Sequence, residues 1–244
     1  MNIATLKAKG LIRPMTAPPA QAADFPFGLG REGLHEVAEK TYGQRAAATG
    51  FVLAANRPAG HHTCLWICQA SHARDLGQVS EAALKQMTGR QLLRFSMFAR
   101  RASEALWAAE EAVVSGAIGH VIAEVDAADF TATRRLALAS TRYGVPVTLL
   151  LPHDTSGATA AATRWRIATC PSAPNSYDPR ASGHSRWQAV LERSRAAPAA
   201  AGQSFDLEWN DETLSLRVVS GLAAGPAATR PAQSGPPGNL RRAG

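Results

Sequence analysis

Short apolar runs alternate with helical patterns through the middle of this chain, and that alternation limits its fold more than any other feature. The segment 63–68 (TCLWIC) is almost continuously apolar, as expected of a strand buried on both faces of a parallel sheet. Further strands are predicted at 34–37, 92–96, 121–125 and 145–151. Because helical patterns separate these strands, right-handed crossovers are required. The sequence therefore predicts an α/β fold, with a mostly parallel sheet flanked by helices.

The predicted helices are marked by apolar spacing and by their ends. The clearest helix runs from Ser103, a suitable N-cap, to Ser115, and Gly116 follows it. The other helices are predicted at 45–55, at 81–87, and from Asp129 or Thr131 to Gly144. Each lies between two predicted strands, as a crossover helix should.

The region after the last of these strands has a different pattern. In the segment 163–167 (TRWRI), Trp165 and Ile167 share one face of a predicted strand and arginines occupy the other. Trp165 is therefore expected in the core. The segment 171–203 is predicted to be a long surface loop with one short helix near 187–193.

A β-hairpin is predicted near the end of the folded region. Its strands are 205–209 and 214–218, joined by a turn at Asn210 and Asp211. We expect the hairpin to pack at the edge of the sheet. The alternative is an open edge that accepts a strand from a partner.

Composition divides the chain into three parts. Residues 1–24 are predicted to be an N-terminal arm or linker, residues 25–220 a single domain, and residues 221–244 a disordered basic tail rich in Gly, Pro and Ala. Three cysteines, an odd number, argue against a disulfide scaffold and favour a reducing compartment. No apolar run reaches the ~18 residues of a membrane span, so we expect a cytoplasmic protein without membrane contact.

The segment after the first predicted strand has the position of a phosphate loop without its chemistry. The G-x-x-x-x-G-K-[ST] loop brings backbone N–H groups, a Lys and a Mg²⁺-binding hydroxyl to phosphate. Here Ala38 stands at the first Gly, Gly43 is kept, and Gln44 and Arg45 replace the Lys and Ser/Thr. The alternative is nucleotide binding without hydrolysis, through Lys40 or Arg45. We predict a structural turn and no cofactor, with a vestigial loop formed by Lys40, Tyr42, Gly43, Gln44 and Arg45.

No catalytic residue is predicted elsewhere. The sequence QASH at 69–72 has no carboxylate where a hydrolytic enzyme would place its water-orienting base. Glu124 and Asp126 lie near the position of a metal-binding acid, but the strand register puts Val125 there. We therefore expect a protein that is not an enzyme.

A metal site is also not expected, although histidines and cysteines gather at 61–72. On an extended strand, Cys64 and Cys68 stand about 13 Å apart (four rises of ~3.3 Å). Their sulfurs cannot then share one zinc at ~2.3 Å. We predict core cysteines and loop histidines.

Arginines are concentrated in the segment 130–195, which holds nine of them against three acids, a formal charge of +6. Arginine interleaved with tryptophan suits single-stranded nucleic acid, and it also suits an acidic protein partner. The alternative is a solvated face. The residues predicted to contact a partner or nucleic acid are Arg134, Arg135, Arg142, Arg164, Arg166 and Trp187.

Several local sequences resemble a known family. The segment 105–122 resembles the helix and strand that lead into the acidic strand of RecA. The closer resemblance is to ImuA, an SOS-associated accessory family of translesion synthesis. It is carried by six motifs, GLHEV (33–37), AAATGF (46–51), ALWAAEEA (105–112), TATRRL (131–136), AATRWRI (161–167) and DLEW (206–209).

The resemblance implies a RecA-like core without a functional phosphate loop, and a non-catalytic role in error-prone DNA synthesis. The implied partners are an ImuB-type Y-family-like protein and an error-prone DnaE-type polymerase, with the RecA filament and single-stranded DNA as further candidates. The location implied is the cytoplasm, with nucleoid association on DNA damage. Alternatives are an SulA-like cell-division inhibitor that binds FtsZ, a RecA/KaiC-type NTPase with a divergent loop, and direct DNA binding as the main role.

Overall fold

The computed structural model describes residues 23–25, 27, 29, 33–56, 63–89, 93–175, 177–178 and 180–219. Its strands are β1 (Ala23–Asp24), β2 (Leu34–Glu39), β3 (Thr63–Gln69), β4 (Leu93–Ala99), β5 (His120–Glu124), β6 (Val147–Leu151), β7 (Thr163–Cys170), β8 (Arg186–Ser194), β9 (Ser204–Asn210) and β10 (Ser215–Val218). Its helices are α2 (Arg45–Ala55), α3 (Ala70–Leu76), α4 (Glu81–Thr88), α5 (Ala102–Ser115), α6 (Phe130–Tyr143) and the 3₁₀ turn η1 (Pro198–Ala200).

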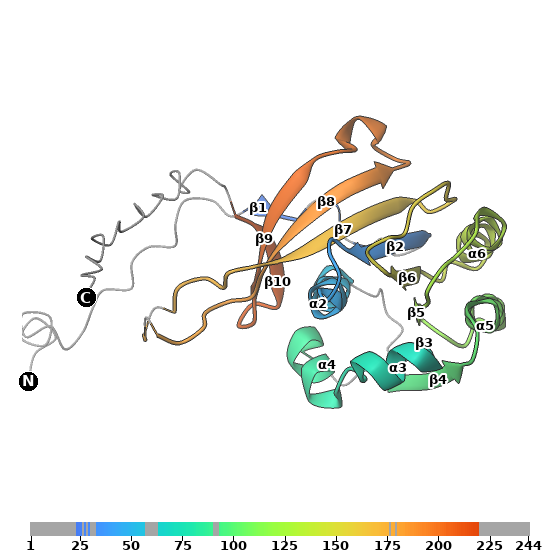
Figure 1. Cartoon of the computed structure of the whole chain (residues 1–244), viewed down its shortest axis with the longest axis horizontal. Helices are drawn as coiled ribbons and strands as arrows, with labels where there is room; N and C mark the ends of the chain where they lie inside the picture. The colour runs from blue at the N-terminus through green and yellow to red at the C-terminus, as the bar shows by residue number, and fades with distance from the viewer. Residues whose placement is uncertain are drawn as a thin grey trace, which may run out of the picture.

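All ten strands form one sheet in the order β1-β10-β9-β8-β7-β2-β6-β5-β3-β4 (Figure 1). Six neighbouring strands of this sheet are parallel, because a crossover connects each to the next along the chain. They are β7, β2, β6, β5, β3 and β4, in the order of the sheet. The remaining four are antiparallel to their neighbours. The sheet order and the flanking helices confirm the predicted RecA-like α/β fold with its C-terminal hairpin.

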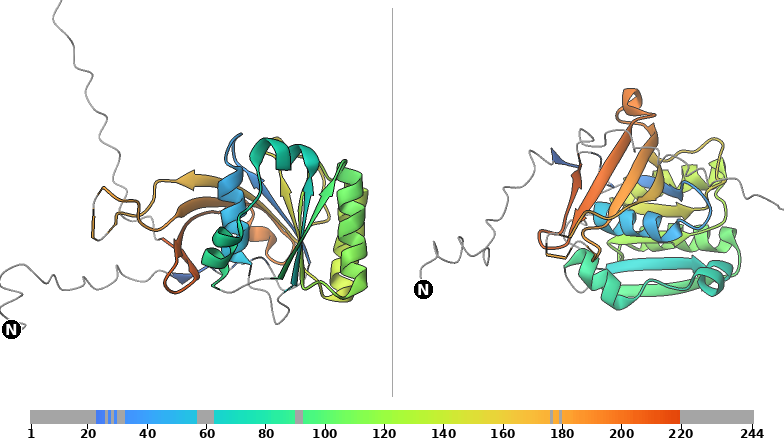
Figure 2. Two further views of the ribbon diagram at one scale, coloured as in Figure 1. Left: turned by 90° about the horizontal axis from the view of Figure 1, so that it is seen from below. Right: turned by 60° about the vertical axis from the view of Figure 1, so that its left-hand side comes forward.

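Helices cover both faces of the parallel half of the sheet. Figure 2 shows α5 and α6 on one side of the sheet and α2 on the other. The α5–α6 side buries one apolar cluster, which includes Leu106, Val113 and Leu136. The α2 side buries a second cluster around Phe51 and Trp165. The strands between them, such as β5 and β6, are therefore buried on both faces, as their apolar runs predict.

The helix ends follow the predicted capping in part. Asp129 caps α6, because its Oδ1 accepts a hydrogen bond from the Ala132 N–H at 2.7 Å. Gly116 and Gly144 end α5 and α6 in the left-handed conformation. The prediction of Ser103 as a cap is wrong: α5 begins one residue earlier, and its N-cap position makes no side-chain hydrogen bond.

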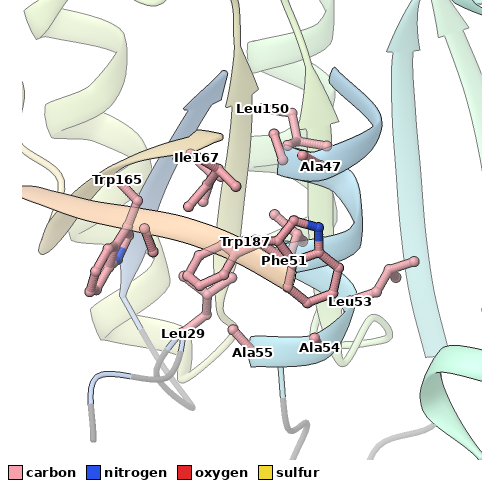
Figure 3. Close-up of a cluster of buried hydrophobic side chains, with 14 of the residues drawn as sticks. Leu29, Ala47, Phe51, Leu53, Ala54, Ala55, Leu150, Trp165, Ile167 and Trp187 are labelled. Carbon is pink, nitrogen blue, oxygen red and sulfur yellow. The ribbon is translucent and has the colours of Figure 1, made fainter. Parts of the chain in front are cut away.

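The predicted loop at 171–203 is wrong in its second half. Residues 186–194 form β8, which pairs with both β7 and β9, instead of a short helix. Trp187, Ala189 and Leu191 point into the core at alternate positions. Figure 3 shows Trp187 against α2, among the buried side chains that surround Phe51. This strand continues the sheet from its parallel half into its antiparallel half.

The hairpin lies where it is predicted, at the antiparallel end of the sheet. It consists of β9 and β10, with a turn after Asn210. The outer edge of β10 pairs with β1, through Ala23 with Val218 and Asp24 with Arg217. Most of residues 1–24 and all of residues 221–244 fall outside the described residues. Among the helices that are described, none has the length and apolarity needed to cross a membrane.

Candidate functional site: the vestigial phosphate loop

The carboxyl ends of β2, β3 and β5 meet at one edge of the sheet. This edge is where an open α/β sheet places its ligands. Residues 40–44 leave β2 there and lead into α2, while α3 follows directly after β3. The vestigial loop is therefore in the position expected of a phosphate loop.

The loop itself is fixed by contacts with neighbouring elements. Gly43 has a φ of +87°, which only glycine adopts without strain, so the retained glycine supports the turn. The Lys40 ammonium donates a hydrogen bond to Gln188 on β8 at 2.8 Å. The Tyr42 ring is 83% exposed and meets His153 edge-on, with 5.8 Å between centroids. Lys40 is thus directed away from the start of α2.

Arg45, the first residue of α2, turns inward and is buried. Its Nη2 lies 3.2 Å from Nδ1 of His72, and His72 Nε2 lies 2.5 Å from a carboxylate oxygen of Asp126. A guanidinium only donates, so Nδ1 of His72 accepts and its Nε2–H donates to Asp126. Arg45, His72 and Asp126 thus form a chain that ties α2 to α3 and to the end of β5.

The two acidic residues at the end of β5, Glu124 and Asp126, have protein partners. The Gln69 side-chain amide makes two hydrogen bonds with Asp126. Its Nε2 donates to the Asp126 carboxylate, and its Oε1 accepts from the Asp126 backbone N–H at 3.1 Å. Glu124 accepts a hydrogen bond from the Trp66 indole at 2.5 Å. Val125 between them is fully buried. Both carboxylates therefore act as structural acceptors at the end of β5.

Several buried polar atoms at this edge of the sheet have no hydrogen-bond partner among the described residues. They are Glu39 Oε2, Gln44 Oε1, Arg45 Nε, Arg45 Nη1 and Ser71 Oγ. A buried polar atom without a partner costs about 1–3 kcal/mol. Each of these atoms therefore needs a partner from outside the described residues, such as water, to avoid that cost.

The cysteines next to the site have poor reactivity. Burial, with the nearby Glu124 carboxylate, raises the pKa of Cys68 to about 12, and burial raises the pKa of Cys64 to about 12. Both thiols are protonated near neutral pH and are weak nucleophiles and metal ligands. No group of His, Cys, Asp and Glu in the described residues is arranged to hold a metal ion. His61 and His62 lie outside the described residues.

The arginines predicted to contact a partner fall into two groups. Arg134, Arg135 and Arg142 project from the exposed side of α6. Arg135 pairs with Glu110 of α5 at 2.5 Å, and the Arg142 guanidinium lies 5.5 Å from the centre of the Tyr143 ring. These three are placed where an external ligand can reach them.

Arg164 and Arg166 on β7 are instead used within the fold. The Arg164 side chain is 12% exposed and donates to Glu36, whose side chain is only 1% exposed, at 2.5 Å. Arg166 pairs with Glu192 at 2.7 Å and donates to the carbonyl oxygens of His153 and Thr155. They fasten the loop after β6 to the sheet.

Trp187 also belongs to the core. It is 6% exposed and packs so closely on α2 that a Cβ added to Gly50 would lie 2.8 Å from its ring. The predicted surface role of Trp187 is therefore wrong in this structure, since no base or partner side chain can stack on it. The six predicted contact residues do not form one surface.

The contacts of His72 and Gln69 with Asp126 are not predicted from the sequence. Fifty-seven residues separate Gln69 from Asp126 in sequence. The topology could have predicted these contacts, because polar residues that follow neighbouring parallel strands lie at the same edge of the sheet.

Comparison with known proteins finds curated relatives that match part of the chain. No protein-family model matches the chain. Two curated relatives, each named Protein ImuA, come from Caulobacter vibrioides strains NA1000 / CB15N and ATCC 19089 / CB 15. Each is 36% identical to this chain over 136 residues, which are 51% of the chain and 55% of the relative. The chain thus spans about half the length of the curated relatives it matches. The similarity bears out the resemblance to ImuA and supports membership of that family.

Proposed function

We propose that this protein is a non-catalytic, ImuA-type accessory protein of error-prone translesion DNA synthesis in the SOS response. The observation that carries the proposal is the vestigial loop. A RecA-like fold is kept, while the residue at the start of α2 is a buried Arg45 bound to His72. The similarity to Protein ImuA gives this altered core its biological context.

The chemistry of the edge supports a binding role over phosphoryl transfer. Transfer needs a Lys and a Mg²⁺-binding hydroxyl beside the phosphates, together with a carboxylate free to hold metal or orient water. Gln44 and Arg45 stand at the first two positions, and Glu124 and Asp126 already accept hydrogen bonds from side chains. A scaffold of this kind contributes contact surface and geometry to an assembly.

The assembly proposed here is the one that the ImuA resemblance implies. Its members are an ImuB-type Y-family-like protein and an error-prone DnaE-type polymerase, with RecA filaments and single-stranded DNA as further candidates. In this role the protein bridges the polymerase machinery and the damaged template. It acts in the cytoplasm and joins the nucleoid on DNA damage.

Nucleotide binding tests the non-catalytic part of the proposal. We expect no rise in melting temperature of the full chain with millimolar Mg-ATP, and no phosphate release above a blank without protein. An Arg45→Ala variant serves as the matched control, since a signal from the loop should change with it. Saturable stabilisation with turnover, both lost in Arg45→Ala, would instead establish the divergent NTPase.

Co-purification tests the assembly. The tagged full chain should retain an ImuB-type protein from the same genome, and FtsZ should not be retained. Retention of FtsZ alone would favour the SulA-like alternative. Because this measurement needs no nucleotide, its result is independent of the Mg-ATP experiment.

A further inference from the structure

The outer faces of α5 and α6 expose an unusual number of apolar side chains. Trp107 is 59% exposed and Leu138 is 63% exposed. Both helices stand in the outermost layer of the molecule (Figure 2). Soluble monomers seldom gather large apolar side chains in one region unless it binds something. The exposed large apolar residues of the two helices are Trp107, Val114, Phe130, Leu138 and Tyr143.

Charge is segregated between the same two helices. The residues of α5 include three glutamates and no basic residue, whereas those of α6 include three arginines and no acidic residue. Each helix combines its own charge with exposed apolar residues. An acidic apolar helix and a basic apolar helix are complementary, and this molecule carries both side by side.

Only part of this complementarity is used within one molecule. Glu110 pairs with Arg135 at 2.5 Å. Within the described part of the chain, Glu111, Arg134 and Arg142 make no ion pair. Charges of both signs therefore remain available for a second molecule.

We infer that the α5–α6 face binds a second copy of this chain about a two-fold axis, with α5 of each copy against α6 of the other. A two-fold interface uses the same patch on both partners, so it requires a patch that is complementary to itself. The segregated charges of α5 and α6 meet that requirement. The inference goes beyond the proposed function and does not rest on it.

The axis predicts specific neighbours. α5 and α6 are both crossover helices of the parallel sheet and run in the same direction. For two copies to face each other, the two-fold axis must lie in the plane of the interface. An axis parallel to the helices then sets α5 alongside α6 of the second copy, with both helices running in the same direction. Trp107 then lies within one helical turn of Leu138 of the second copy, and Glu111 within one turn of Arg142. A hollow of about 360 Å³ between the helices, lined by Leu106, Trp107 and other side chains, can receive the incoming leucine.

Other occupants fit this face less well. The chain segments 1–22 and 220–244 contain basic residues and no acid, so they do not complement α6. Nucleic acid would meet the exposed Leu138 and the glutamates of α5 along with the arginines. A second copy matches both signs of charge and the apolar residues together.

The size of the face predicts how strong the association is. Two 14-residue helices, each about 21 Å long and about 10 Å apart, present roughly 400 Å² of flat area. This is below the ~800 Å² per partner of a standard stable complex. We therefore expect a weak, reversible dimer.

Sedimentation of the full chain over a concentration series tests the inference. The wild type should pass from monomer to dimer, and Leu138→Glu should weaken dimerisation at least tenfold while melting temperature and circular dichroism stay unchanged. Tyr42→Ala is the matched control, because it removes an exposed aromatic ring from another edge of the molecule. A wild type that stays monomeric throughout would overturn the inference, as would a dimer that Leu138→Glu leaves intact.

A charge exchange makes the test specific to the proposed pairing. Glu111→Arg and Arg142→Glu should each weaken the dimer severalfold, because each places like charges near one another. In the double variant, the change in the logarithm of the dissociation constant should be at most half of the sum of the changes in the two single variants. If the double variant is weaker than both single variants, the pairing of α5 with α6 of the second copy is wrong.

Discussion

The arginines of α6 and those of β7 are the same residue type in one basic segment, yet the fold uses them in opposite ways. Arg134 and Arg142 extend from the outer side of α6. Arg164 and Arg166 lie on β7, in the middle of the sheet, and hold buried or half-buried glutamates. A count of charges along the sequence does not separate exposed arginines from structural ones, because the structural role depends on a buried partner carboxylate that lies far away in the sequence.

Arg164→Ala is expected to give the largest effect. It leaves the Glu36 carboxylate, which is 1% exposed, without its cation, and breaking a buried pair from one side costs about 3–5 kcal/mol. Urea unfolding should show this loss as a shift in midpoint. Arg134→Ala is the matched control and should stay within about 0.5 kcal/mol of wild type. Equal losses in the two variants would remove the contrast between α6 and β7.

The two tryptophans Trp187 and Trp107 extend the comparison to apolar residues. Trp187→Ala removes a ring from the core and should cost about 3–5 kcal/mol in free energy of unfolding. Trp107→Ala should change the unfolding free energy by less than about 1 kcal/mol, since its ring is largely exposed. Thermal unfolding of both variants gives the answer. The comparison fails if Trp107→Ala is the more destabilising change.

The buried His120 gives an effect that depends on pH. Burial lowers its pKa to about 3, while the unfolded chain has a value near 6.5. Below pH 6.5 the unfolded state takes up a proton that the native state refuses, so stability falls as pH drops from about 6.5 toward 3. The slope from this group reaches about 1.4 kcal/mol per pH unit. His120→Gln should flatten the profile between pH 4 and 6.5, as measured by urea unfolding at a series of pH values.

Arg166→Ala is expected to have the smallest effect of the series. Its partner Glu192 remains accessible to water when the arginine is lost, so the cost should be about 1 kcal/mol. Chemical denaturation at low and high salt measures it. A loss as large as that of Arg164→Ala would show that the backbone contacts of Arg166, and not its ion pair, set its contribution.

The parallel half of the fold could be predicted from the sequence because its signals are local. Continuous apolar runs mark β3, β5 and β6, and glycines mark the ends of α5 and α6. The predicted helix at 45–55 coincides with α2. Each of these features is encoded within a few residues.

What failed depends on contacts that are distant in sequence. The alternation of Trp187, Ala189 and Leu191 was present, but flanking Pro, Gly and Ser favoured a loop. The role of Arg164 depends on Glu36, which is 128 residues away. The inward turn of Arg45 depends on His72, after another strand. Local patterns identify elements, whereas the partner of a charged side chain follows only from the order of strands in the sheet.

The position of β2 between β6 and β7 also has a consequence for biosynthesis. His35 pairs with Thr148 on one side and with Thr163 on the other, so both neighbours of this early strand are made more than a hundred residues later. Closing such long loops slows folding. As the ribosome releases the chain, β2 is the first strand of the parallel half to be translated, yet both of its edges stay unpaired until β6 and β7 have been made.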